Sequence, residues 1–242
     1  MSKRKYPMTF SEFSFRGLGY VLLFVFGILC VIPFYLIAIS SFADESSLIR
    51  NGFQLIPEHF SLDAYKMVFT NPERIGRAYF NTILTTTVGT CLSLLLSTLT
   101  GYVLSRRDFK WRNGFSFFFF FTTLFSGGLI PWYTLCTQVL HLKNTYMGLI
   151  LPMVFSVWNM IIAKNYMAGI PYEISESAKI DGAGEIRIYA QLYLPVAKPL
   201  LATLGLFSAL GYWNDWYNSM LFSTKAEMQS LQYFLQDMLS TI

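Results

Sequence analysis

The chain alternates between long apolar runs and shorter polar segments. Four runs lack Asp, Glu, Lys and Arg altogether, and a fifth is interrupted only by Asp215. A helix needs about 20 apolar residues to cross the hydrocarbon core of a membrane. Because the runs are continuous rather than alternating, they predict spanning helices and not the strands of a barrel. The predicted spans cover about 17–43, 78–105, 113–142, 144–166 and 199–224.

Composition supports this pattern. Hydrophobic residues make up 54% of the 242 residues and charged residues 13%, whereas soluble domains carry roughly 25% charged residues. The first apolar run could be read as a signal peptide, but it is too long for a signal core and lacks a clear cleavage site. The sequence therefore predicts an all-α, polytopic integral membrane protein with a retained first span.

Orientation follows from the distribution of Lys and Arg in the connecting loops. With residues 1–16 in the cytoplasm, twelve of these residues fall inside and six outside, as the positive-inside rule requires. This topology places 171–195 in the cytoplasm, and it places the loop 44–77 and the segment 225–242 outside. We expect a short interfacial helix at 62–69. The external segment should form an amphipathic helix because Met228, Leu231, Phe234, Leu235 and Met238 recur at helical spacing.

Candidate catalytic chemistry is sparse. Cys30, Cys91 and Cys136 are scattered through apolar runs and are read as small hydrophobic residues. His59 and His141 have no ligand partner at metal-binding spacing, and no nucleophile or phosphate-binding motif occurs. The net charge of +4 arises from basic residues at membrane edges, so it does not indicate nucleic-acid binding. No enzymatic activity and no metal site are expected.

The polar segment 171–195 has the pattern of a helix, a bend and a second helix. Pro171 suits a first helical turn, and Glu173 and Glu176 suit the positive end of that helix. Gly182 can end it in a left-handed conformation, and a second helix can start at Glu185. Small residues that would admit another backbone gather near the bend: Ser177, Ala178, Gly182, Ala183 and Gly184. These features alone fit an ordinary capped loop equally well.

The spacing of Glu176, Ala178, Gly182, Leu194 and Pro195 resembles the EAA loop of ABC importer permeases. That pattern reads Glu-Ala-Ala, three residues, Gly, nine residues, Ile-x-Leu-Pro. Ser177 replaces its second letter and Leu192 replaces its isoleucine. The resemblance extends over essentially the whole chain and is to the smaller, maltose-permease-like subunit of carbohydrate importers. The family fold has a sixth span that these five runs do not supply, and we expect it to be missing from this chain.

The resemblance implies that the loop transmits force from an ATPase subunit, with Glu176 as the salt-bridge residue and Gly182 as the bend. Lys179 and Arg187 are expected to be solvated or to lie beside lipid headgroups. The residues so assigned to coupling are Glu176, Ser177, Ala178, Asp181, Gly182, Ala183, Leu192, Leu194 and Pro195.

The resemblance also implies the assembly and its location. The expected partners are a second homologous permease, an ATPase dimer that binds ATP and Mg, and an external solute-binding protein. The chain itself needs no cofactor. It would be a multi-pass protein of the bacterial cytoplasmic (inner) membrane that imports an oligosaccharide by alternating access.

Two stretches inside the spans are candidates for the translocation pathway. The first comprises Trp213, Asn214, Asp215 and Trp216 and resembles an aromatic-polar stretch of carbohydrate permeases. An ionisable group at membrane depth usually faces a cavity, although an interfacial aromatic belt with a snorkelling acid is the alternative. The second is Gly127–Gly128 with the proline that follows, which could be a hinge, a pathway lining or a tolerated kink.

Three weaker expectations and two alternative functions remain. Asn81 and the neighbouring threonines are expected to make interhelical hydrogen bonds, and Lys164 is expected to anchor a span at the cytoplasmic surface. An importer of amino acids or polyamines is an alternative within transport. A membrane scaffold without transport activity is the alternative of another class, but a scaffold has no need for the EAA spacing.

Overall fold

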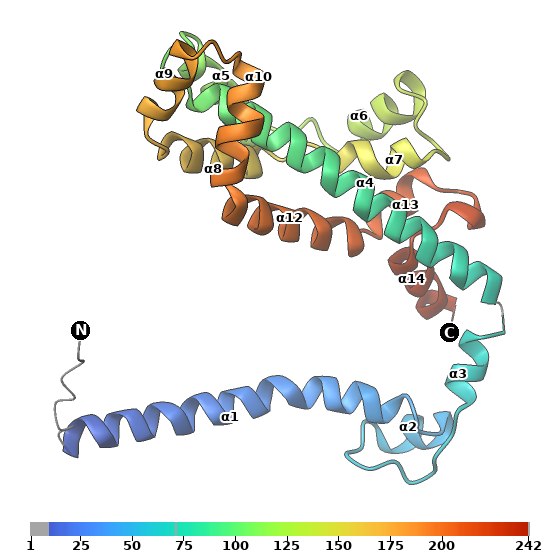
Figure 1. Ribbon diagram of the computed structural model, residues 1–242. Coiled ribbons are helices and arrows are strands. Elements are labelled where there is room, and N and C mark those ends of the chain that lie inside the picture. Colours follow the sequence, from blue (N-terminus) through green and yellow to red (C-terminus); the bar gives the residue numbers. More distant parts are fainter. Residues whose placement is uncertain (1–9, 71, 242) are drawn as a thin grey trace. The chain divides into compact units, whose positions relative to one another are not determined.

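The computed structural model of the protein describes residues 10–70 and 72–241. Lys3, Arg4 and Lys5, which belong to the predicted cytoplasmic segment 1–16, lie outside the described residues. The described part is helical and contains no β-strand beyond one isolated bridge. The chain divides into two compact units, Met1–Pro72 and Glu73–Ile242 (Figure 1).

The first unit contains α1 (Phe10–Ser40), α2 (Glu45–Asn51) and α3 (Asp63–Val68). The segment Phe15–Ser40 is long and apolar enough to cross a membrane. The loop beyond it folds back locally, since the Tyr35 hydroxyl donates to the Leu55 carbonyl at 2.8 Å and the ring of Phe42 stacks on that of Phe60. The helix predicted at 62–69 is present as α3.

The second unit is built around α4 (Pro72–Ser105), an unbroken helix of 34 residues that is about 50 Å long at 1.5 Å per residue. It packs against α8 (Val157–Ala168) and α12 (Lys198–Trp213). A small polar layer joins the three helices, because Ser93 and Asn159 each lie 3.3 Å from the Ser208 hydroxyl. Such interhelical hydrogen bonds favour close approach of helices in a membrane.

Three of the five predicted spans are not straight helices. The third divides into α5 (Arg112–Leu124) and α6 (Leu129–Thr134) with a π-helical turn, at an angle of 113°. The fourth divides into α7 (Tyr146–Ile150) with a 3-10 turn and α8, at 51°. The predicted fifth span ends at Trp213 and is followed by the short α13 (Tyr217–Phe222). A third bent pair joins Glu185–Val196 to Lys198–Trp213 at 84°. The described residues hold two helices that are long and apolar enough to cross a membrane, or up to five spans if each of the three bent pairs counts as one.

The predicted amphipathic helix is present as α14 (Leu231–Thr241), and its apolar face lies against the first turns of α4. Leu231 and Phe234 are buried in a cluster with Ala78. The Asn81 amide donates to the carbonyl of Gln229 at 3.1 Å, and the Leu231 N–H donates to the Thr82 hydroxyl at 2.8 Å. Asn81 and Thr82 therefore make the predicted bonds to another segment, whereas the Thr85 hydroxyl donates to the Asn81 carbonyl of its own helix at 2.8 Å. The Lys164 amine donates to the Ser116 hydroxyl at 2.8 Å.

Candidate functional site

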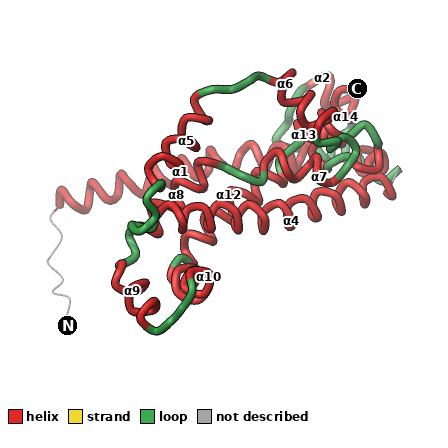
Figure 2. Tube along the Cα trace, turned by 90° about the horizontal axis from the view of Figure 1, so that it is seen from above, coloured by secondary structure: helices red, strands yellow, loops and turns green. Residues whose placement is uncertain are grey.

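The predicted EAA loop is a helix, a bend and a second helix at one end of α4, away from the C-terminal segment (Figures 1 and 2). Its first arm is α9 (Tyr172–Ile180), which begins after Pro171. The arm ends at Gly182, whose φ of 80° is left-handed as the sequence predicted. The Ala183 N–H donates to the Ala178 carbonyl and the Gly182 N–H to the Lys179 carbonyl, at 2.9 and 3.0 Å. This pair of bonds is the Schellman arrangement, which satisfies the last carbonyls of the helix.

The second arm runs from Glu185 to Val196. It comprises α10 (Glu185–Ile188), a π-helical turn at Tyr189–Tyr193 and α11 (Leu194–Val196). The widened turn lies just before Pro195, which has no N–H to donate. Four of the predicted coupling residues pack partly buried against one apolar cluster that joins the arms: Ala178, Ala183, Leu192 and Leu194.

The other coupling residues are exposed; those near the bend form what we call its outer face, whereas Pro195 lies at the end of the second arm. Glu176, Ser177 and Asp181 are exposed. Ile180 and Ile186, one on each side of the bend, are each 82% exposed. Sequence reasoning missed these two isoleucines, although apolar residues in an otherwise polar segment are a usable signal. Beside them is a hollow of about 230 Å³ lined by Ala178, Asp181, Ala183, Arg187, Ile188, Gln191 and Leu192.

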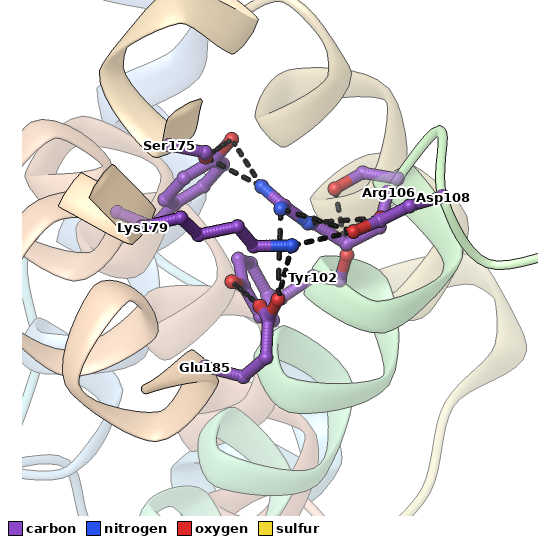
Figure 3. A network of polar contacts seen from close by, with 8 residues as sticks. Tyr102, Arg106, Asp108, Ser175, Lys179 and Glu185 are labelled. Carbon is purple, nitrogen blue, oxygen red and sulfur yellow. Dashed lines mark hydrogen bonds and ion pairs between the residues drawn. The ribbon is translucent and has the colours of Figure 1, made fainter. Parts of the chain in front are cut away.

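The inner face of the bend is held by a polar network that the sequence did not reveal (Figure 3). Its centre is Arg106, directly after α4, whose side chain is only 5% exposed. The guanidinium donates to the hydroxyl of Ser175 on the first arm and, at 3.4 Å, to that of Tyr193 on the second. It also lies 3.4 Å from Asp108 and 3.7 Å from Glu185. One buried cation thus contacts both arms of the loop and the end of α4.

Lys179 completes the network. Its Nζ lies 2.6 Å from Oδ2 of Asp108 and 2.7 Å from Oε1 of Glu185. The Tyr102 hydroxyl donates to the other oxygen of Glu185 at 2.6 Å. The prediction that Lys179 is solvated or beside lipid headgroups did not include these ion pairs, although its side chain is still 37% exposed. Lys179 lies one helical turn after Ser175, so both side chains face the end of α4.

The charges of this network stabilise one another. The hydrogen bond from Lys179 holds the pKa of Asp108 below its ordinary value. Burial acts to raise the pKa of Glu185, but hydrogen bonds from Lys179 and Tyr102 outweigh it and lower that pKa. Hydrogen bonds to Asp108 and Glu185 raise the pKa of Lys179. Both carboxyls and the amine are therefore charged at neutral pH.

The candidate pathway residues lie elsewhere in the second unit. Gly128 has a φ of 86° and directly precedes α6, so the chain break predicted here is present. Gly127 and Gly128 line a hollow of about 480 Å³, together with Ser126, Leu129, Pro131, Trp132, Leu135 and Tyr217. Tyr217 follows the aromatic stretch 213–216 and lines the hollow at the break between α5 and α6. The sequence indicated these two candidate regions separately.

The four residues from Trp213 to Trp216 do not line that hollow. Asp215 is half-buried, and its two carboxylate oxygens accept from the backbone and side-chain amides of Asn218 at 3.1 and 3.0 Å. It therefore caps α13, which explains why the predicted fifth span ends here. Asn214 donates to the Leu210 carbonyl of its own helix at 2.9 Å, and Trp216 is 41% exposed. A pathway role for these residues stays a prediction.

Within residues 10–70 and 72–241, no group of three or more His, Cys, Asp or Glu side chains is placed to hold a metal ion. Cys136 is buried, and Cys30 and Cys91 are exposed on the isolated chain.

No protein-family model matches the chain, but individual proteins do. It is 38% identical over 222 residues to the polygalacturonan/rhamnogalacturonan transport system permease protein YtcP of Bacillus subtilis, covering 92% of this chain and 77% of that protein. It is 40% identical over 210 residues to the protein LplC of the same organism, covering 87% and 70%. An arabinooligosaccharide transport permease of Halalkalibacterium halodurans, AraQ, is 30% identical over 220 residues, covering 88% and 77%.

A solved structure has the same fold. The chain aligns with a TM-score of 0.86 and 28% identity to a bacterial ABC transporter involved in the import of the acidic polysaccharide alginate, over 98% of this chain and 84% of that one. The fold, the apolar helices and these relatives agree with the sequence prediction. The chain is an integral membrane protein and belongs to the permeases of carbohydrate ABC transport systems, which are the non-catalytic transport subunits of such importers.

Proposed function

We propose that this permease forms half of the pathway of an oligosaccharide importer and receives the force of ATP hydrolysis through its EAA loop. The partners would be a second homologous permease, a dimer of ATPase subunits that binds ATP and Mg, and an external solute-binding protein. The relatives are named for polygalacturonan, rhamnogalacturonan and arabinooligosaccharide transport, and the structural neighbour for alginate import. These names favour a saccharide over amino acids or polyamines.

The outer face of the bend carries this proposal. Ile180 and Ile186 present two large apolar side chains at 82% exposure, and the carboxylates of Glu176 and Asp181 lie next to them. An apolar centre with a charged rim is the composition of a protein–protein interface. The hollow lined by Ala178, Asp181 and Leu192 among others adds a concave surface to the loop. The EAA spacing of the loop, which a scaffold does not need, favours an ATPase as the partner over a scaffold role.

Orientation is part of the same proposal. The N-terminus and the EAA loop would lie in the cytoplasm, where ATP is available. The loop between α4 and α5 supports this placement, since it carries Arg106, Arg107, Lys110 and Arg112 within a few residues. Such a cluster marks the cytoplasmic side of a membrane protein.

A charge reversal on the outer face tests the coupling. In the complete importer, Glu176→Lys should leave membrane insertion intact and weaken retention of the ATPase subunits during purification. Stimulated ATP hydrolysis and uptake of labelled oligosaccharide into proteoliposomes should fall together. The control is Lys110→Glu, a charge reversal of equal magnitude and opposite sign at an exposed position of the α4–α5 loop. Normal uptake by Glu176→Lys at normal assembly would refute the coupling role.

The substrate class needs a separate measurement. ATP hydrolysis by the reconstituted importer with its binding protein should rise with uronic-acid or arabinose oligosaccharides. It should not rise with amino acids or polyamines. Stimulation by an amino acid or a polyamine alone would overturn the sugar assignment and leave the coupling role standing.

A further inference from the structure

We propose that Arg106, Asp108, Lys179 and Glu185 act as a clasp that fixes the angle of the EAA bend and makes both arms move with α4. The inference rests on the proposed function of the loop, but its own test does not require the loop to bind an ATPase. The four residues are positioning residues, since their polar atoms contact one another across the loop, while the side chains of Asp108, Lys179 and Glu185 stay 41%, 37% and 51% exposed.

The first step is that the clasp joins three separate chain segments. Arg106 and Asp108 follow α4, Lys179 belongs to the first arm, and Glu185 begins the second arm. The contacts between segments are 2.6 Å from Lys179 to Asp108, 2.7 Å from Lys179 to Glu185 and 3.7 Å from Arg106 to Glu185. Figure 3 shows these side chains converging on one point from the ends of their helices.

The second step is that the bend needs such a clasp. Between the arms the chain contains Gly182 and Gly184, and a Cβ added at either would meet no atom within 4 Å. Nothing therefore packs around these two positions to set the bend from outside. Glycine also permits more backbone conformations than other residues. The apolar cluster at Ala178 and Ala183 holds the arms together, and directional ion pairs can select one angle between them.

The third step concerns the choice of cations. The guanidinium of Arg106 is a planar group with five donors, and it uses them toward Ser175 on one arm and Tyr193 on the other. Lys179 separates the carboxylates of Asp108 and Glu185, which would otherwise repel each other. Removal of Lys179 would leave the two carboxylates with Arg106 as a shared cation at the longer distances of 3.4 and 3.7 Å, so the attraction across the bend would weaken. Such a site would be expected to open.

The fourth step is that α4 can carry a displacement from the clasp to the outer segment. α4 is unbroken from Pro72 to Ser105. At its other end, Thr82 accepts a hydrogen bond from Leu231, at the start of α14, at 2.8 Å. The clasp and α14 are therefore attached to the same stiff helix, α4. A tilt of the EAA loop would tilt α4 and so move α14.

Distance measurements test the clasp directly. Spin labels at Glu173 and Ala190, both exposed, report the angle between the arms by pulsed electron resonance in the assembled importer. The three native cysteines are first replaced by serine. Lys179→Met should broaden the distance distribution, Lys179→Arg should retain the wild-type width, and Lys110→Met on the α4–α5 loop is the control. If the distance distribution of Lys179→Met keeps the width of the wild-type protein, the proposed clasp is refuted.

Transport provides the second readout. Lys179→Met should keep the ATPase subunits bound and keep ATP hydrolysis, but sugar imported per ATP should fall about fivefold or more, the range of coupling between distant sites. An unchanged ratio would overturn the role of the clasp in coupling. Failure of the proposed function would look different. In that case Glu176→Lys would leave retention of the ATPase subunits unchanged, whereas Lys179→Met would still broaden the label distance distribution.

Discussion

Gly101 on α4 lies directly against Ala163 on α8. A Cβ added at Gly101 would lie 2.7 Å from the Cβ of Ala163 and 2.8 Å from the backbone nitrogen of Lys164. The two helices therefore cross with only a hydrogen atom between their backbones, which is the role of small residues in membrane helix packing. The crossing lies one to two turns before Arg106, so it fixes the part of α4 that holds the EAA loop.

The Gly101→Ala substitution should accordingly destabilise the permease. Overpacking of a close contact costs about 1–3 kcal/mol, and here the obstacle includes rigid backbone. Gly76→Ala is the control, since a Cβ at that position of the same helix would meet no other part of the protein within 4 Å. It should be neutral or slightly stabilising, because alanine favours a helix over glycine. Thermal unfolding of the purified complex would measure both variants, and equal midpoints would contradict the close crossing.

The bend of the EAA loop predicts an asymmetry between two glycines. Gly182 has a φ of 80°, whereas Gly184 has a φ of −72°. Gly182→Ala should cost about 1–2 kcal/mol because a Cβ disfavours the left-handed conformation, and Gly184→Ala should cost little. Gly182→Asn should be intermediate. Oligosaccharide uptake and the label distance between Glu173 and Ala190 would rank the three variants, and equal tolerance of alanine at both positions would contradict the structure.

The clasp should also open in acid. The pKa values of Asp108 and Glu185 are lowered from ordinary values of 3.8 and 4.5. Their stabilisation is therefore complete above those values and is lost as the pH falls through the lowered pKa. The pKa of Lys179 is raised from 10.5, so its contribution is complete below that pH and is lost as the pH rises through the raised value.

The resulting window covers all of the neutral range. The label distance across the bend should be constant between about pH 5 and pH 10 and should broaden below the ordinary values of the two carboxyls. Asp108→Asn should be broader than wild type already at neutral pH and should change less on acidification. A distribution that broadens near pH 7 in the wild-type protein would show that another group controls the bend.

Local features of this fold could be predicted from the sequence, and features that depend on distant segments could not. The left-handed Gly182 and the break at Gly127–Gly128 follow from what glycine permits at a single position. The pairing of Asp108 with Lys179 joins residues that are 71 positions apart, so no local pattern indicates it. The comparison of Lys and Arg on the two sides of the membrane used the neighbouring Arg106 only for its positive charge. Hydropathy also does not record the direction of the chain, so the turns within the predicted fourth and fifth spans had no signal in the sequence, unlike the break in the third.

Asp215 distinguishes a structural from a transport role for the aromatic stretch. Its carboxylate caps α13 through Asn218, and Tyr217, the first residue of α13, lines the hollow at Gly127 and Gly128. If capping is its role, Asp215→Asn and Asp215→Ser should keep uptake near wild type, because both side chains cap helices well. Asp215→Ala should lose about 0.5–2 kcal/mol of local stability, seen as faster hydrogen exchange in α13, and should lower uptake by displacing Tyr217. Loss of uptake in Asp215→Asn without faster exchange would instead assign the negative charge to the translocation pathway.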